Sequence, residues 1–377
     1  MAKLRTARLA DVIGVLNQLF PPGLAEDWDN VGLQVGDPKA EISKILVCLD
    51  AEEVALEEAQ RSGAQLLISH HPLIFRALKR LSPTDMTGKV LFRAIKADIA
   101  VVSAHTNLDR AADGLNDWLA LRLGLKDSRP LEQPECGEFY KLVIYVPCGH
   151  ENEVMEAVFA AGAGQIGAYD RCSFRARGIG SFRGDDGTQP FIGTAGEFEE
   201  TEEVRLETIV PKRELAKVVA RMLKAHPYEE VAYDLIPLAN QLTTVGLGRV
   251  GELAEPLLLQ EFAEQVKTCL QVSSLRLVGD LHHRVSRVAV CGGTGMSTYF
   301  DAVRSGADCL VTGDVKFHEA QRARADGIAI IDAGHFATER LMVEGLSQRL
   351  KSVFAERQFA IEVLEMEAEK DPFVTVS

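Results

Sequence analysis

The 377-residue sequence predicts an α/β protein: a main domain with a mostly parallel sheet and flanking helices, interrupted by a ferredoxin-like α+β insert. Short apolar runs alternate with helical patterns near both ends of the chain, which is typical of βαβ units. The central block has a different order of elements, and the first pattern resumes after it. We therefore expect the main domain in two halves, 1–126 and 247–377, around an insert at 127–246.

The first half contains three apolar runs that are short enough to be strands buried on both faces of a sheet. These runs are Ile45–Leu49, Gln65–Ser69 and Ile99–Ser103. Helices are expected at 1–20, 53–61 and 115–123, and Asp50 is placed to cap the second of them.

The insert begins with a Pro- and Gly-containing stretch, Asp127–Glu138, which we interpret as a linker. Beyond it the expected elements follow the order β-α-β-β-α-β of the ferredoxin-like split βαβ arrangement. Its strands are predicted at 141–146, 172–182, 203–210 and 231–236, and its helices at 151–161 and 212–224.

The second half of the main domain resumes with a helical pattern at Pro256–Leu270. Four apolar runs with helices between them then predict further buried strands. They lie at 275–278, 288–291, 309–312 and 328–331.

Composition excludes several classes of protein. Hydrophobic residues make up 46% and charged residues 25%, as in globular rather than disordered or fibrous chains. The formal net charge of −14 argues against broad nucleic-acid binding. Seven cysteines without a C-x-x-C pair favour neither a disulfide framework nor a thiolate zinc site. No apolar run is long enough to predict a membrane span, so a cytoplasmic location is expected.

Histidines directly follow three of the predicted strands. The segments are Ser69-His70-His71-Pro72, Ala104-His105-Thr106-Asn107-Leu108-Asp109 and Gly334-His335-Phe336-Ala337-Thr338-Glu339. In open α/β sheets ligands bind at the carboxyl ends of the strands, where loops converge. We therefore expect the three segments to form one site.

The donor types at this site predict metal binding, because imidazole and carboxylate are ligands of Zn, Fe and Mn. A mononuclear catalytic zinc takes about three protein ligands, whereas more donors gather here, which favours two divalent ions about 3.5–4 Å apart. His105 is either a ligand or a residue beside the ions that acts as an acid or orients a ligand. The competing interpretation is that each histidine satisfies a backbone group at a strand end. The donors are His70, His71, His105, Asp109, His335 and Glu339.

Other polar residues are weaker candidates. Asp314 and His318 also follow a predicted strand, although helix capping by Asp314 is slightly favoured. The glycine-rich segment 292–295 can offer backbone N–H groups to an anion. Arg76, Lys79 and Arg80 can bind phosphate, but a solvated basic stretch is commoner. The pair His282-His283 is expected in an exposed loop.

Five motifs in order along the chain resemble the NGG-interacting-factor-three-like family, whose members are also labelled GTP cyclohydrolase 1 type 2 homologues. The resemblance implies that His70, His71, Asp109, His335 and Glu339 bind two metal ions, with the two carboxylates as bridges and His105 beside them. The motifs are Asp27-Trp28-Asp29-Asn30-Val31-Gly32-Leu33, Ser69-His70-His71-Pro72-Leu73-Ile74-Phe75, His105-Thr106-Asn107-Leu108-Asp109, Thr312-Gly313-Asp314 and Gly334-His335-Phe336-Ala337-Thr338-Glu339.

The insert is similar to that of the longer bacterial members of the family, which looks like the trimeric PII and CutA proteins. The stretch that carries this likeness is 226–234, HPYEEVAYD. Membership implies a homo-hexamer whose metal sites face an internal cavity.

Two functions fit these observations. The first is a metal-dependent hydrolase acting on a nucleotide-like small molecule, with His105, or Asp314 with His318, relaying a proton. It would release formate from C8 of the guanine of GTP or cleave a phosphoester. The alternative is a non-catalytic, metal-dependent adaptor or regulator that uses the PII-like insert. An open coordination position, which structural zinc sites lack, favours chemistry.

Overall fold

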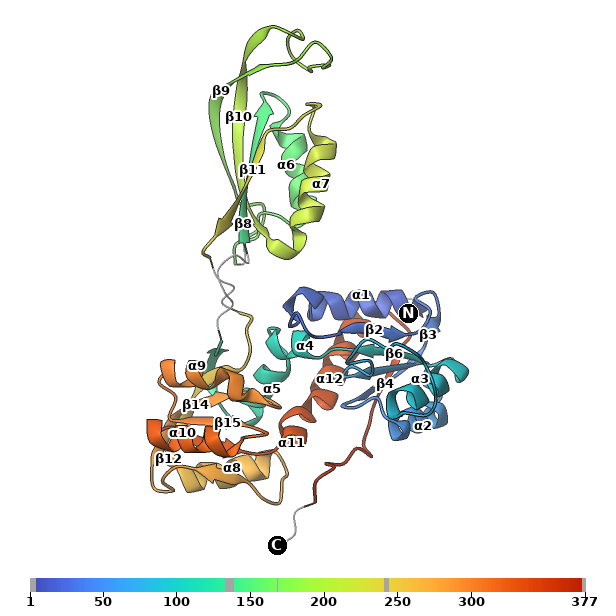
Figure 1. Ribbon diagram of the computed structural model, residues 1–377, viewed down its shortest axis with the longest axis vertical. Helices are drawn as coiled ribbons and strands as arrows, with labels where there is room; N and C mark the ends of the chain where they lie inside the picture. The colour runs from blue at the N-terminus through green and yellow to red at the C-terminus, as the bar shows by residue number, and fades with distance from the viewer. Residues whose placement is uncertain (1–4, 133–138, 168, 241–243, 375–377) are drawn as a thin grey trace. The chain divides into compact units, whose positions relative to one another are not determined.

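The computed structural model describes residues 5–132, 139–167, 169–240 and 244–374. The chain divides into two compact units (Figure 1). Unit 1 comprises Met1–Gln133 and Thr243–Ser377, and unit 2 comprises Pro134–Leu242. Within the described ranges, no helix combines the length and the apolar character that crossing a bilayer requires.

Unit 1 contains two main sheets, whereas the sequence suggested one. The first has five strands in the order β17-β4-β5-β6-β2, all parallel except the edge strand β2. Because β17 comes from the C-terminal end of the chain, this sheet is completed by the second half of the sequence. Its strands are β2 (Gly32–Val35), β4 (Lys44–Cys48), β5 (Leu66–Ser69), β6 (Ala100–Ser103) and β17 (Glu362–Glu365).

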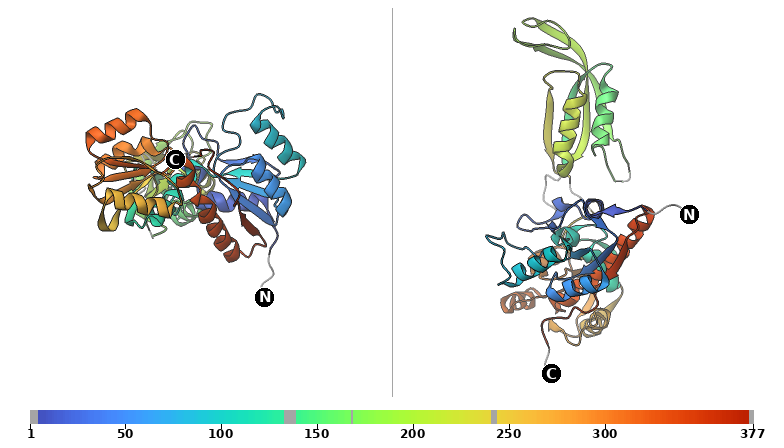
Figure 2. Two further views of the ribbon diagram at one scale, coloured as in Figure 1. Left: turned by 90° about the horizontal axis from the view of Figure 1, so that it is seen from below. Right: turned by 90° about the vertical axis from the view of Figure 1, so that its right-hand side faces the viewer.

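Helices cover both faces of this sheet (Figures 1 and 2). This explains why its central strands β4, β5 and β6 are buried at nearly every position and are mostly apolar. Ile45 and Val47 of β4 pack with α1 and α12, while Leu46 and Cys48 pack with α2 and α3 on the opposite face. Strands β1 (Ala7–Arg8) and β3 (Glu41–Ile42) form a separate two-stranded ribbon, whose Ile42 packs in the same core as Ile45 and Val47. The helices are α1 (Leu9–Leu19), α2 (Glu53–Ser62), α3 (Met86–Lys96) and α12 (Leu341–Glu356).

The second sheet of unit 1 has six strands in the order β13-β16-β15-β14-β12-β7. Its three central strands, β14, β15 and β16, are parallel, and the outer pairings are antiparallel. The strands are β7 (Lys126–Pro130), β12 (Arg249–Leu258), β13 (Arg276–Val278), β14 (Arg284–Val290), β15 (Cys309–Thr312) and β16 (Ala329–Asp332). The accompanying helices are α5 (Leu115–Arg122), α8 (Leu259–Cys269), α9 (Tyr299–Arg304) and α10 (Phe317–Asp326).

Two expectations are wrong at this sheet. Residues 127–130, expected in a linker, belong to β7, and Pro130 is tolerated there because β7 is an edge strand. The helix expected from Pro256 begins at Leu259, because 256–258 continue β12. The rest of the expected linker, 133–138, lies outside the described residues.

Unit 2 is a four-stranded antiparallel sheet in the order β11-β8-β10-β9, with two helices on one face (Figure 1). Leu142 and Ile144 of β8 pack against Val158 of α6 and Val218 of α7. The elements follow one another as β-α-β-β-α-β, the order expected from the sequence. They are β8 (Phe139–Pro147), α6 (Glu151–Ala160), β9 (Ser173–Arg183), β10 (Phe198–Pro211), α7 (Leu215–Ala225) and β11 (Tyr233–Leu238).

The chain leaves and re-enters unit 1 at neighbouring points. The backbone N–H of Leu131 donates to the carbonyl of Gly248 (3.2 Å), and that of Glu132 donates to the carbonyl of Leu247 (3.0 Å). The hydrophobic cores of unit 1 contain no described residue of 134–242. Unit 1 therefore has what it needs to fold without unit 2.

We expect a chain in which a short Gly/Ser linker replaces residues 134–242 to fold and to bind divalent metal as the full chain does. The linker has only to join two chain ends that already pair. Circular dichroism and metal analysis of the purified protein check this. A deletion variant that is unfolded or has no metal would contradict the division into domains.

Candidate metal centre

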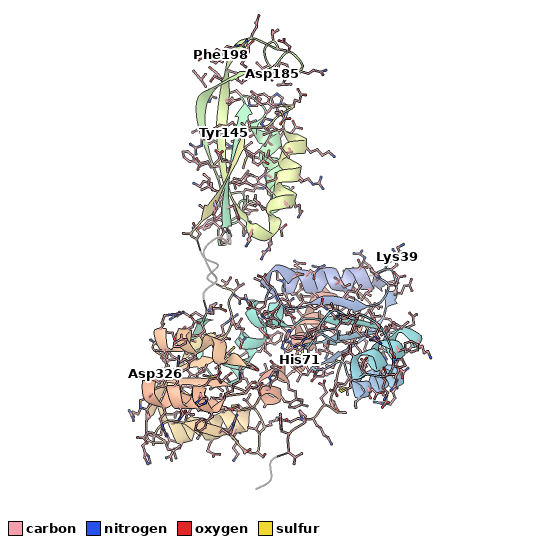
Figure 3. All side chains as sticks on the ribbon, in the orientation of Figure 1. Lys39, His71, Tyr145, Asp185, Phe198 and Asp326 are labelled. Atoms are coloured by element: carbon pink, nitrogen blue, oxygen red, sulfur yellow. The ribbon has the colours of Figure 1, made fainter. Side chains whose placement is uncertain are left out.

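The six donors predicted from the sequence come together in unit 1 at the ends of three strands. His70 and His71 follow β5, and His105 follows β6 and precedes the short helix α4 (Thr106–Arg110), which carries Asp109. His335 and Glu339 begin and end the short helix α11 (His335–Glu339), which follows β16 of the other sheet. Figure 3 labels His71 within this region.

Glu339 lies at the middle of the cluster. One of its carboxylate oxygens, Oε2, is 3.0 Å from Nε2 of His71 and 2.9 Å from Nε2 of His335, and these two nitrogens are 3.3 Å apart. The other oxygen is 3.8 Å from Nε2 of His70, which is itself 3.4 Å from a carboxylate oxygen of Asp109. His70 is fully buried and Glu339 almost so.

The His105 ring joins the same group. One ligand atom from each of His70, His71 and His105 lies within 4.8 Å of the others, and the same is true of His71, His335 and Glu339. These trios share His71. The structure therefore holds two overlapping sets of side chains that can bind a metal ion.

The second nitrogen of every ring is already engaged. Nδ1 of His70 contacts the carbonyl of Ala104 (2.8 Å), and the other three rings contact carboxylates. The carboxylate partners are Asp50 for His71 (2.8 Å), Asp29 for His105 (2.9 Å) and Asp314 for His335 (2.8 Å). Carbonyl and carboxylate oxygens only accept hydrogen bonds, so each Nδ1 carries the donated proton. This assignment leaves Nε2 of each neutral ring with a lone pair, the arrangement of a metal-binding histidine.

The centre therefore consists of hydrogen-bond acceptors that face one another. Nε2 of His70, Oδ1 of Asp109 and Oε2 of Glu339 are buried and find no hydrogen-bond donor among the described residues while the rings are neutral. The short contacts of Glu339 with His71 and His335 become hydrogen bonds only if those rings take a second proton. Buried acceptors without donors are costly. Cations, as metal ions or as protons, are what the arrangement requires.

The pKa values without metal show that protons can fill this role. Burial opposes charge on His71, but its hydrogen bonds to Asp50 and Glu339 raise its pKa to about 10. The hydrogen bond to Glu339 raises the pKa of His335 to about 9, against burial. Burial alone would raise the pKa of the Glu339 carboxyl, but the hydrogen bonds from His335 and His71 hold that pKa well below its usual range. Burial lowers the pKa of His70 to about 3 and raises that of Asp109.

Three carboxylates that orient the rings were not identified as such from the sequence. Asp50, expected to cap α2, instead holds His71, and the N-cap of α2 is Glu52, whose side chain makes no capping bond. Capping by Asp314 is also wrong, because α10 begins after Lys316 and Asp314 bonds Thr294 and His335. Asp29 lies in the first motif, but its distance from His105 in sequence hides their contact.

The remaining candidates do not join the centre. His318 is exposed and bonds Gln321, and His282 and His283 are exposed as expected. The N–H groups of Gly292, Gly293 and Gly295 donate to Asn116, Thr338 and Thr312, so these three groups are not available to an anion. The glycines serve packing instead: a Cβ at Gly293 would lie 2.0 Å from a carboxylate oxygen of Glu339.

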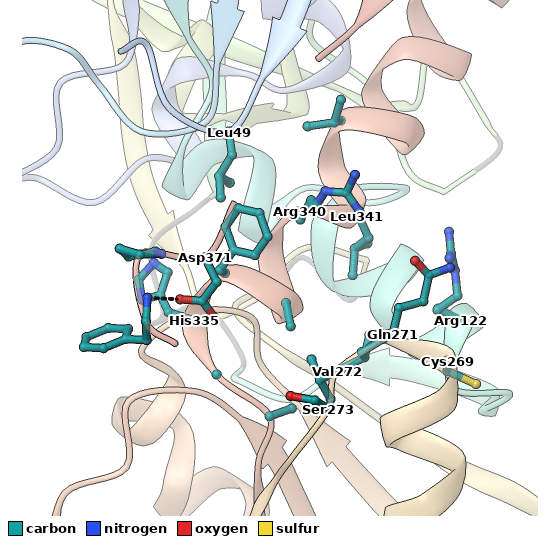
Figure 4. A pocket seen from close by; sticks show the side chains of 18 of the residues that line it. Leu49, Arg122, Cys269, Gln271, Val272, Ser273, His335, Arg340, Leu341 and Asp371 are labelled. Atoms are coloured by element: carbon teal, nitrogen blue, oxygen red, sulfur yellow. Dashed lines mark hydrogen bonds between the residues drawn. The ribbon is translucent and has the colours of Figure 1, made fainter. Parts of the chain in front are cut away.

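A cavity of about 1250 Å³ borders the centre on the side of Asp50, His71, Asp314 and His335 (Figure 4). The C-terminal segment 366–373 contributes residues to its wall. Glu369 in this segment accepts hydrogen bonds from the backbone N–H groups of Leu49 (2.8 Å) and Asp50 (2.9 Å). The C-terminal segment is thereby attached to the same turn that presents Asp50 to His71.

The model of the family described as DUF34/NIF3 (NGG1p interacting factor 3) matches residues 7–372. The chain belongs to the DUF34/NIF3 family. The match covers almost the whole sequence, including both parts that supply the side chains of the candidate metal centre.

Named relatives and solved structures agree with this membership. Two relatives carry the name GTP cyclohydrolase 1 type 2 homolog. The one from Halalkalibacterium halodurans is 44% identical over 83% of this chain and 84% of its own length. The one from Bacillus subtilis is 44% identical over 81% of this chain and 82% of its own length. The solved structure of a Bacillus cereus protein related to NIF3 is 39% identical, covers 100% of both chains and has a TM-score of 0.84. A Staphylococcus aureus structure is 30% identical, with a TM-score of 0.81 over 98% of this chain and 99% of that one.

Replacing Asp50 by Ala is expected to weaken zinc binding by about 10- to 100-fold, because His71 loses the acceptor that fixes its tautomer. Competition with a chromophoric chelator measures the affinity. The matched control is Glu52→Ala, which removes an exposed acid two residues away that makes no capping bond. Equal affinities of the two variants would contradict the role of Asp50.

Zinc affinity is also expected to rise with pH between about 6.5 and 9. His71 and His335 have pKa values raised to about 10 and about 9, so at neutral pH the metal-free centre holds protons that a cation must displace. Each displaced proton adds about one unit to the logarithm of the binding constant per pH unit. The same competition assay across this range checks the sign, and an affinity that is flat or falls with pH would contradict it.

Proposed function

We propose that the protein is a metal-dependent hydrolase with a centre for two divalent ions, Zn, Fe or Mn, that acts on a nucleotide-like small molecule. His70, His71, Asp109, His335 and Glu339 are the proposed ligands. The observation that carries the proposal is the set of buried acceptor atoms that face one another without donors. Five ligands over two ions leave coordination positions for water and substrate, unlike a closed structural site.

The two ions, when bound, supply a Lewis acid and a means of activating water at neutral pH. The carboxylates of Asp109 and Glu339 come from different helices, α4 and α11, and are the proposed bridges. The position of Glu339 between His71 and His335 supports this role, because its Oε2 is about equally close to both rings.

His105 is the proposed acid–base residue. Its Nδ1 donates to Asp29, whose pKa is lowered to about 2, against burial, by hydrogen bonds from His105 and Thr106. Asp29 therefore stays ionised and keeps the accepting nitrogen of the ring, Nε2, available to take a proton. The His105 ring is 5.1 Å from that of His70 and 5.5 Å from that of His71, which places it beside the proposed ions.

The substrate class rests on the names of the relatives, which describe GTP cyclohydrolase 1 type 2 homologs. In the cyclohydrolase reaction, one water adds to C8 of guanine and opens the five-membered ring by breaking the C8–N9 bond. A second water then hydrolyses the resulting formamide at N7 and releases formate. A phosphoesterase would use the same ions on phosphorus. The homo-hexamer implied by the family resemblance is part of the proposal, and sedimentation of the purified protein tests it.

The test is formate release from GTP by protein reconstituted separately with Zn, Mn and Fe. Glu339→Gln keeps the shape of the side chain but removes the charge of one bridge, so we expect at least about a 100-fold loss of turnover together with a lower metal content. The control variant is Glu356→Gln, which changes an exposed acid at the end of α12, away from the cavity wall.

Two ions bound without formate release would exclude GTP ring opening and leave phosphoester cleavage to be assayed on the same samples. Full turnover in Glu339→Gln would contradict the proposed centre. Circular dichroism of the variant shows whether a lost activity reflects a lost fold.

A second candidate is a metal-dependent adaptor or regulator that binds a partner through unit 2. The edge strand β9 favours it, because Phe174 and Ile179 expose 64% and 73% of their surface there. The chain with residues 134–242 deleted separates the two proposals. A hydrolase retains formate release in that variant, whereas an adaptor shows no turnover in either chain.

A further inference from the structure

Two exposed aromatic rings stand beside the metal centre and have no part in the function proposed so far. Trp28 exposes 59% and Phe75 49% of their surface, and their ring centroids are 5.8 Å apart. The Trp28 and His105 rings also form a T-shaped pair, with centroids 6.0 Å apart. Ligand sites combine hydrophobic and aromatic side chains with a small number of polar groups, so rings exposed next to a polar site are candidates for contact with a ligand.

The loops that carry these rings are fastened to each other. The side-chain amide of Asn30 donates to the carbonyl of Ile74 (2.6 Å), and the N–H of Ile74 donates to the side-chain oxygen of Gln34 (3.1 Å). Gln34 in turn donates to the carbonyl of Asn30 (2.8 Å). These bonds fix the residues that follow Trp28 and precede Phe75, so the spacing of the rings is set before a ligand arrives.

A further contact sets the position of the ring pair relative to the centre. Asp29, the neighbour of Trp28, accepts from Nδ1 of His105 (2.9 Å), from the N–H of Thr106 (3.1 Å) and from the hydroxyl of Thr106. One carboxylate therefore orients the proposed acid–base residue and holds the Trp28 loop against it. A group bound on the rings would lie within reach of His105.

The charge around the rings favours an anionic ligand. Arg76, directly after Phe75, and Lys79 and Arg80 shortly beyond are exposed, and no ion pair of theirs is found within the described ranges. Asp27 is the exposed opposing charge, while Glu26 is engaged by Arg110. The cavity that borders the centre has more acidic than basic side chains in its wall, which disfavours a polyanion there. Its seven carboxylates, among them Glu365, Glu367 and Asp371, stand against the three arginines Arg122, Arg276 and Arg340.

We propose that Trp28 and Phe75 form a stacking platform for the heteroaromatic base of a purine nucleotide, with the basic stretch from Arg76 to Arg80 receiving its phosphates. The proposal rests on the proposed hydrolase and names how its substrate is held. Every base has a π-face that stacks on aromatic side chains, and such stacking contributes about 1–3 kcal/mol per base. The base would be presented beside His105, where ring chemistry requires it.

Calorimetric titration of the metal-loaded protein with GTP, guanosine and inorganic tripolyphosphate tests the platform. Trp28→Ala and Phe75→Ala are expected to weaken GTP and guanosine binding by roughly 5- to 150-fold and to leave tripolyphosphate unchanged. Trp28→Phe keeps a ring and should bind GTP within about threefold of the natural chain. The joint replacement of Arg76, Lys79 and Arg80 by Ala should weaken GTP and tripolyphosphate but not guanosine.

The matched control is Phe300→Ala, which removes a ring that exposes 52% of its surface and contacts Tyr299 rather than a histidine. Tryptophan fluorescence provides a second readout, since the chain has only Trp28 and the half-buried Trp118. Guanosine should quench the natural chain and leave Trp28→Phe unquenched.

Unchanged guanosine affinity in both alanine variants overturns the platform, as does a loss equal to that of Phe300→Ala. A fall in the mass of the assembly in Trp28→Ala, with nucleotide affinity retained, would show that the rings pack against another copy of the chain. The metal content of each variant keeps the two proposals apart. Platform variants that bind GTP weakly but keep their metal support the platform even if no formate is released. If the natural chain itself binds no metal, that result counts only against the hydrolase.

Discussion

Four imidazole rings and two carboxylates face one another in unit 1. Each ring already donates a hydrogen bond from its Nδ1 atom to an oxygen outside the centre. While the rings are neutral and the carboxylates ionised, the atoms that remain can only accept hydrogen bonds. No rearrangement of hydrogen bonds within the centre satisfies them, so the local structure depends on positive charge at this point. Position 293 is a glycine with φ of +60°, and a side chain there would collide with Glu339. The absence of a side chain therefore leaves room for the carboxylate at the middle of the centre.

The architecture brings distant parts of the sequence to this point. His71 and His335 are 264 positions apart, yet their Nε2 atoms are 3.3 Å apart. Strand β17 returns to pair with β4, and the buried guanidinium of Arg249 joins α5 to β12 by bonds to Asp117 and to backbone carbonyls. The two sheets of unit 1 thus support one centre, while unit 2 has a core of its own and is inserted where the chain ends lie side by side.

The sequence alone was sufficient to identify the candidate metal-binding side chains, but not the carboxylates that orient them. Histidine after an apolar strand is a local signal, and strand ends converge by topology, so His70, His105 and His335 could be placed in one site before the fold was known. Asp50 and Asp314 also follow strands, but a carboxylate near a helix start is as well explained by capping. Asp29 is too far from His105 in the sequence for their contact to be inferred. The split into two sheets was also hidden, since β17 and β7 find their partners through long-range pairing that no local pattern encodes.

Anomalous X-ray diffraction at the zinc edge, from crystals of the zinc-loaded full chain, tests this account most directly. It predicts two peaks about 3.5–4 Å apart among His70, His71, Asp109, His335 and Glu339, with the Nδ1 bonds to Asp50 and Asp314 intact. A centre without an anomalous peak, with the acceptor atoms turned toward donors elsewhere in the protein, would contradict it.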